Sequence, residues 1–142
     1  MSNYQLFRIV TSAVIHNNDG KFLLAQRSAK DSNLPNFWAI PAGHVEFDQT
    51  NVETLEDNLK REVMEEIGVE INNIQYLDSN GWVDPEYKKI TIAFLCTIKS
   101  GEPKPLDETQ AVKWLSFSEL EKLNLAPNVL RVITKASEVL NN

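Results

Sequence analysis

One long helical pattern, set between β-rich segments, constrains the fold of this 142-residue chain more than any other feature. Apolar residues recur at intervals of three and four along residues 51–67, which predicts a helix that buries one face. Thr50 and Glu53 have the spacing of a capping box at its start, and Gly68 is suited to the left-handed conformation at its end. The apolar positions are Val52, Leu55, Leu59, Val63 and Ile67.

The chain before this helix is predicted to be mostly strand. Residues 7–16 and 21–27 are β-rich, and the Asn-Asn-Asp-Gly segment between them predicts a hairpin turn because glycine adopts a positive φ without steric cost. Residues 28–36 are polar and contain proline, so we expect a loop. Residues 37–40 then begin a third extended segment, which we expect to end at Pro41-Ala42-Gly43.

Beyond the helix we expect further strands and then C-terminal helices. The β-rich segment at residues 88–99 is apolar enough for a central strand, and its Cys96 is expected to be buried there. Ser116 and Glu119 form a second capping box, and Pro127 has the position of a first helical residue. The expected elements are strands at 69–78, 88–99 and 111–115, a loop at 100–107 and a final helix reaching about residue 140.

This element order and the composition predict one α+β domain over residues 1–142, or an α/β/α sandwich. A net charge of −6 argues against a surface that binds long nucleic acid, although a small phosphorylated ligand is compatible if a cation mediates. The single cysteine excludes an intrachain disulfide. No signal-like or membrane-spanning apolar run is found, so we expect a cytoplasmic protein without a membrane partner.

Three carboxylates share one side of the predicted helix. Glu62, Glu65 and Glu66 fall within an arc of about 100° on a helical wheel, and this arc borders the apolar stripe. Clustered, partly buried carboxylates are costly unless a positive charge compensates them, and oxygen ligands of this kind suit Mg²⁺ or Mn²⁺. The helix alone leaves two interpretations open: a divalent cation site, or a solvated acidic flank with local ion pairs from Lys60 and Arg61.

The segment from Gly43 to Val69 resembles the signature of the Nudix hydrolases. That signature is glycine, five residues, glutamate, seven residues and then R-E-U-x-E-E-x-G-U, where U is bulky and aliphatic. Residues 61–69 match every fixed position, and Glu53 has the expected spacing before them. Residues 37–46 also look like the family's strand before the motif, and residues 111–116 look like its late strand. The resemblance covers most of the chain and implies a Nudix-like α/β/α sandwich with a mixed β-sheet.

The signature has two departures in this chain. Nine residues, not five, separate Gly43 from Glu53, and Gln49 stands where ungapped counting places the first glutamate. We take Glu53 as the counterpart because the capping box and the helix register favour it. Ala42 also replaces a glycine that is often seen there. The longer loop puts the shape of the substrate entrance in doubt, but not the acidic helix.

The resemblance implies a magnesium-dependent hydrolase. Glu62, Glu65 and Glu66 would ligate Mg²⁺, or Mn²⁺, and Gly43 would contribute a backbone group to a ligand or let the loop approach it closely. Arg61 would orient a carboxylate through a charge-assisted hydrogen bond. The identity of the general base stays open between Glu65 of the signature and Glu108 of a later loop. Glu108 could instead be an exposed acidic residue in a turn. The remaining residues expected to contact substrate are Arg27, Trp38, His44, Glu46 and Tyr87.

The substrate implied is a nucleoside diphosphate-linked compound cleaved at its phosphoanhydride bond. Nucleoside triphosphates are the first expectation, with ADP-ribose, sugar nucleotides and dinucleoside polyphosphates as alternatives. Pro85 and Tyr87 lie near positions where the family carries markers for two of these classes, so neither class is selected. A catalytically silent, nucleotide-sensing Nudix domain and an acidic module without metal are the rival functions, and a homodimer is an open expectation.

Overall fold

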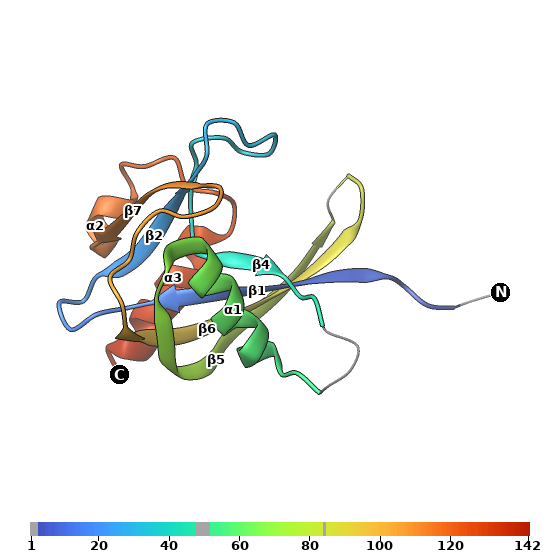
Figure 1. Ribbon diagram of the computed structural model, residues 1–142, viewed down its shortest axis with the longest axis horizontal. Coiled ribbons are helices and arrows are strands. Elements are labelled where there is room, and N and C mark those ends of the chain that lie inside the picture. The colour runs from blue at the N-terminus through green and yellow to red at the C-terminus, as the bar shows by residue number, and fades with distance from the viewer. Residues whose placement is uncertain (1–2, 48–51, 84) are drawn as a thin grey trace.

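The computed structural model describes residues 3–47, 52–83 and 85–142 (Figure 1). Its strands are β1 (Phe7–Ile15), β2 (Phe22–Arg27), β3 (Trp38–Ala39), β4 (Ala42–His44), β5 (Glu70–Val83), β6 (Lys88–Ser100) and β7 (Thr109–Leu115). Its helices are α1 (Leu55–Ile67), α2 (Phe117–Leu120) and α3 (Val129–Leu140). No helix in these ranges is long and apolar enough to cross a membrane.

The described strands form a mixed sheet and a smaller antiparallel sheet. The mixed sheet has the order β4-β1-β6-β5, with β1 parallel to β6 and the other neighbours antiparallel. The smaller sheet has the order β3-β2-β7. β6 is therefore a central strand, as its apolar sequence predicts, and Cys96 is buried at 1% exposure.

The mixed sheet is covered by α1 on one face and α3 on the other. Successive residues of a strand point to opposite faces, and β1 shows this directly. Ala13 and Ile15 pack in the cluster that contains the buried residues of α1. Val14 packs in the cluster that contains the buried residues of α3. The predicted α/β/α sandwich is confirmed.

Helix α1 begins later than its sequence pattern predicts. Its N-cap is Thr54, whose side chain accepts from the backbone N–H of Asp57 at 3.0 Å, while the Asp57 carboxylate accepts from the Thr54 N–H at 3.3 Å. This capping box satisfies first-turn amides, so the helix starts at Leu55 and not near residue 51. Val52 precedes it and is 98% exposed, so its predicted place on the buried face is wrong. Thr50, the predicted cap, lies outside the described residues.

The other end of α1 agrees with the sequence. Gly68 has φ 72° and donates its N–H to the Met64 carbonyl, as expected for a left-handed C-terminal residue. The buried residues Leu59, Val63 and Ile67 form the predicted apolar stripe. The helix therefore presents its glutamates beside a firmly buried face.

The predicted hairpin between β1 and β2 forms only at its tip. Gly20 has φ 72° and donates to the Asn17 carbonyl at 3.2 Å, as the turn requires. Beyond the single bridge between His16 and Phe22, however, the two strands enter different sheets. β1 pairs with β4 and β6, and these longer ladders replace hairpin pairing.

Three further boundaries differ from the predictions. Ala42 and Gly43 do not end an extended segment but begin β4, because they pair with Ser12 and Thr11 of β1. Pro127 is not the first helical residue: α3 begins at Val129, after Asn128 in the left-handed region with φ 76°. β5 also runs on to Val83, five residues past the predicted strand end at residue 78.

Candidate functional site

A pocket of about 420 Å³ lies where α1, β4, the β5–β6 hairpin and the segment before α3 meet. This volume is within the range of small-molecule sites. One wall of the pocket, which we call the acidic wall, is made by α1 and the loop before β7. Its residues are Glu62, Glu65, Glu66, Asp107 and Glu108. The three helix glutamates expected to act together therefore line one pocket.

Glu66 is the most strongly perturbed acid of this wall. Its Oε2 accepts a hydrogen bond from the Ala42 N–H at 3.3 Å. Burial is the main influence and raises the pKa of Glu66 to about 8. The Ala42 N–H, which is next in size, lowers the pKa, while the charges of Glu62 and Asp107 raise it and that of Arg27 lowers it. The charged form of Glu66 is thus costly in the protein alone.

Glu62 is perturbed in the same direction. Burial, and then the neighbouring Glu65 carboxylate, raise the pKa of Glu62. The Glu62 side chain also fills the space beside Gly43. A Cβ added to Gly43 would overlap it, since this atom would lie only 2.8 Å from Glu62 Cγ. Glycine at this position lets β4 approach α1 closely enough for the glutamate side chains to reach the strand.

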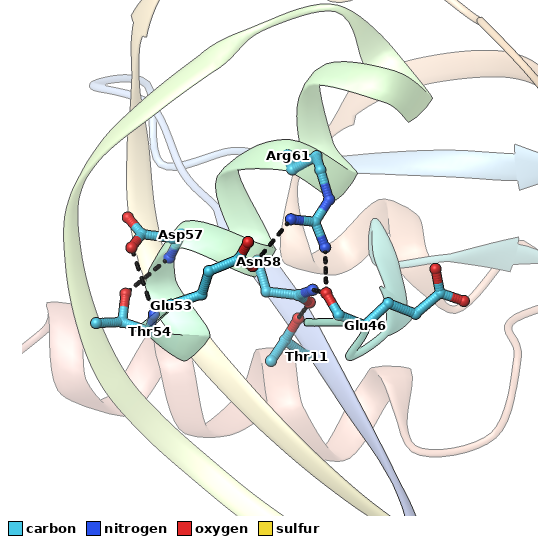
Figure 2. A network of polar contacts seen from close by, with 7 residues as sticks. All are labelled: Thr11, Glu46, Glu53, Thr54, Asp57, Asn58 and Arg61. Carbon is cyan, nitrogen blue, oxygen red and sulfur yellow. Dashed lines mark hydrogen bonds and ion pairs between the residues drawn. The ribbon is translucent and has the colours of Figure 1, made fainter. Parts of the chain in front are cut away.

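Arg61 contacts the loop after β4, outside the pocket (Figure 2). Its Nη2 donates to the Glu46 carbonyl at 2.7 Å, and its Nη1 lies 3.3 Å from Glu53 Oε2. The carboxylate that it orients is therefore Glu53. In the described ranges Arg61 forms no ion pair with the acidic wall, so it does not supply the local pairing of a solvated flank.

A second wall, the basic-aromatic wall, comprises His44, Trp82, Tyr87 and Lys89. Lys89 Nζ lies 4.8 Å from the Trp82 ring centroid and 5.4 Å from that of Tyr87, and the His44 and Tyr87 rings are 6.3 Å apart. Burial, followed by the positive charges of Arg8 and Lys89, lowers the pKa of His44. His44 Nε2 is buried and has no hydrogen-bond partner within the described part of the chain. A neutral imidazole there can donate to or accept from a ligand.

The other residues expected to contact substrate are placed unequally. Arg27 lines the pocket, held by Asp31 at 2.7 Å and by the Asn33 carbonyl at 2.9 Å. Trp38 does not line it, because this residue is only 6% exposed and packs in the core. The Glu46 side chain is exposed and points away from the network in Figure 2, so only its carbonyl contributes to that network.

Asp107 and Lys89 are among the lining residues that the sequence analysis does not name. Asp107 adjoins the candidate Glu108, so its neighbourhood was a usable signal. Lys89 lies in an apolar strand pattern with nothing local to mark it, and only the pairing of β5 with β6 brings it beside Trp82.

The donor chemistry of the acidic wall fits a hard divalent cation. Several carboxylates share the pocket, and burial and mutual repulsion disfavour the charged forms of Glu62 and Glu66. Oxygen ligands of this kind are those that Mg²⁺ and Mn²⁺ prefer, and such a charge would relieve the repulsion. Across the described ranges, no three His, Cys, Asp or Glu side chains already converge on one point. The acids line the pocket without forming a closed ligand set.

Comparison with known proteins gives a consistent result for the sequence. The NUDIX domain family matches residues 6–136. The chain is 32% identical over 126 residues to the NAD-capped RNA hydrolase NudC of Vibrio atlanticus, covering 88% of this chain and 41% of that protein. It is 30% identical to NudC of Pseudomonas aeruginosa, covering 90% and 44%. The chain thus spans less than half the length of these curated relatives.

Solved structures give the same fold. The MutT NUDIX hydrolase from Burkholderia pseudomallei superimposes with a TM-score of 0.80 at 22% identity, covering 92% of this chain and 98% of that one. An ADP-ribose pyrophosphatase from Streptococcus suis has a TM-score of 0.74 at 25% identity, covering 96% and 94%.

Proposed function

The chain belongs to the Nudix family, and from this premise we propose that it hydrolyses a phosphoanhydride bond in a nucleoside diphosphate-linked compound with the help of Mg²⁺ or Mn²⁺. The observation that carries the proposal is a single pocket lined both by the acidic wall and by the basic-aromatic wall. Carboxylates suit a cation that accompanies phosphates, and aromatic and basic side chains suit a nucleoside and its remaining negative charge.

Each acid of the signature has a part in this proposal. Glu62, Glu65 and Glu66 would hold the cation, and Gly43 would keep the strand close to them. A bound cation would neutralise the negative charge of the substrate phosphates and lower the pKa of a water molecule. Arg61 would act from outside the pocket by holding the Glu53 carboxylate and the Glu46 carbonyl.

Two acids are candidates for the general base. Glu65 is on α1, lines the pocket and is exposed, so its carboxylate would be within reach of an attacking water molecule. Glu108 is placed by its own backbone, since its carbonyl accepts from the Ser28 N–H at 2.9 Å. That bond holds the loop before β7 against the end of β2, which brings a second carboxylate to the same pocket.

For the substrate we propose a nucleoside diphosphate joined to a second group, with nucleoside triphosphates as the competing class. The relatives named as NAD-capped RNA hydrolases and the neighbour named as an ADP-ribose pyrophosphatase support this choice, because NAD and ADP-ribose both contain ADP joined to a further ribosyl group. His44, Tyr87 and Arg27 would contact the parts of the substrate away from the scissile bond.

The experiment is a substrate panel with Mg²⁺, with Mn²⁺ and with chelator. ADP-ribose, NAD, a sugar nucleotide, nucleoside triphosphates and a dinucleoside polyphosphate are incubated in parallel, and the phosphorylated products are separated and identified. We expect metal-dependent release of AMP and ribose 5-phosphate from ADP-ribose. Turnover of triphosphates alone would replace the substrate class. Nucleotide binding without turnover of any compound would overturn the hydrolase proposal in favour of a sensing domain.

A further inference from the structure

Two fully buried polar side chains join α1 to the mixed sheet. Asn58 of α1 and Thr11 of β1 are both 0% exposed. Asn58 Oδ1 accepts from the Thr11 hydroxyl at 3.4 Å, and Asn58 Nδ2 donates to the Glu46 carbonyl at 3.3 Å (Figure 2). Burying polar groups is unfavourable unless they are paired, so these partners favour one arrangement of helix and strand.

The two bonds of Asn58 reach the strand that pairs with β4 and the chain just after β4, which carries Gly43. Thr11 stands opposite Gly43 in the ladder between β1 and β4. Glu46 follows β4, and its carbonyl also accepts from Arg61 Nη2 at 2.7 Å. The side chain of Asn58 thereby ties α1 to the strand facing Gly43 and to the chain just after it.

The same helix face makes two more contacts with this segment. Residues 58, 62 and 66 are spaced four apart and lie along one side of α1. Glu62 packs against Gly43, and Glu66 accepts from the Ala42 N–H at 3.3 Å. Among the three, only Asn58 makes its contacts through groups that do not line the pocket.

We propose that Asn58 is a positioning residue that holds β4 against α1 and so sets the placement of the Glu62 and Glu66 carboxylates toward a bound cation. An amide suits this place because its oxygen accepts from the threonine hydroxyl while its N–H₂ group donates to the carbonyl. The consequence for turnover rests on the proposed function, whereas the consequence for cation binding is measured without substrate.

The test uses variants that remove the bonds stepwise. Asn58→Ala removes both, Thr11→Val removes the hydroxyl at constant shape, and Thr11→Ser restores the hydroxyl. Ile133→Val trims a buried residue of α3 outside the network and controls for general loss of stability. Gly43→Ala, which displaces Glu62 directly, is the positive control.

Affinity for Mn²⁺ alone is measured in the substrate-free protein, and kcat and KM are measured where the wild type turns over. We expect Asn58→Ala to weaken Mn²⁺ binding about 10-fold, the lower end of the loss caused by removing a group bonded directly to a metal ligand, because Asn58 acts through Thr11 and Glu46. The variant should lower kcat more than it raises KM. Thr11→Val should change both in the same direction to a smaller degree. Thr11→Ser and Ile133→Val should keep the wild-type affinity.

The inference is overturned if Asn58→Ala and Thr11→Val both bind Mn²⁺ as tightly as the wild type while Gly43→Ala binds it less tightly. That result would leave the proposed function standing. If the wild type hydrolyses no compound, but Asn58→Ala and Thr11→Val bind Mn²⁺ less tightly than the wild type, the proposed function is overturned and the inference stands. If Asn58→Ala does not fold, the Thr11→Val and Thr11→Ser pair decides. Equal weakening in Ile133→Val and Thr11→Val would show a general stability effect and overturn the proposal.

Discussion

Glu66 on α1 and Asp78 on β5 are both carboxylates withdrawn from solvent, yet their surroundings are opposite. Asp78 is 6% exposed and is held by Arg131 and by Lys135 Nζ at 3.1 Å, both from α3. Burial opposes its ionisation, but hydrogen bonds and charges from the two cations outweigh this and lower the pKa of Asp78. Glu66 has an amide N–H and further acids as neighbours, and its pKa rises to about 8.

The difference separates a carboxylate whose charge the fold itself compensates from one that we propose to be a cation ligand. On the α3 face of the sheet, the chain supplies the compensating cations itself. On the α1 face, acidic side chains gather beside a pocket, and we propose that a bound cation compensates them there. Changing each acid should therefore have opposite consequences for activity and stability.

The largest effect is expected from Glu66→Gln. Turnover should fall by at least about 100-fold, because the lost group is a proposed cation ligand. Losing a ligand should cost more than losing a residue that only orients a ligand. The metal-free protein should be as stable as the wild type or more so, since glutamine still accepts from the Ala42 N–H without a buried charge. Steady-state kinetics and urea unfolding measure the two. Glu56→Gln, at an exposed site in the same helix, is the matched control, and near-normal turnover in Glu66→Gln would break the comparison.

A smaller effect, on stability alone, is expected from Asp78→Asn. We expect the free energy of unfolding to fall by about 1–2 kcal/mol, because charge-assisted hydrogen bonds are lost. The penalty stays limited because the Arg131 and Lys135 side chains are 51% and 45% exposed and remain hydrated. Denaturant unfolding and kinetics are compared with Glu102→Gln in the exposed loop before β7. A loss of turnover with unchanged stability would contradict the assignment of Asp78 to the fold.

A third effect is on the pH dependence of stability, and here the two acids have opposite signs. The pKa of Glu66 is about 8 in the folded protein against an ordinary 4.5, so its stabilising contribution is complete below about pH 4.5 and is lost as the pH rises through about 8. The pKa of Asp78 is lowered from 3.8, so its contribution is present above that value and is lost as the pH falls toward the lowered pKa.

Unfolding of the metal-free protein between about pH 3 and 9 measures both slopes. Glu66→Gln should flatten the fall in stability between about pH 4.5 and 8, and Asp78→Asn should flatten the fall below about pH 4. An unchanged slope between about pH 4.5 and 8 in Glu66→Gln would mean that another group causes the loss.

Much of the fold follows from local patterns in the chain. The strands, the buried stripe of α1 and its end at Gly68 agree with the sequence because each depends on residue spacing or on one backbone conformation. The sequence prediction places the start of α1 a turn too early, because the helix is capped by the box at Thr54 and Asp57. Pairing between distant strands, which no local pattern reveals, replaced the predicted β1–β2 hairpin.

The sequence by itself determined that Glu62, Glu65 and Glu66 lie on one side of a helix, and that the chain carries the Nudix motif, because helical periodicity acts over a few residues. The tertiary structure alone decided which groups meet these acids and which acids are compensated. Asn58 and Thr11 are 47 residues apart, and Asp78 and Arg131 are 53 apart. Their contacts depend on how the sheet pairs and which helix covers each face, and this is a property of the whole packed chain.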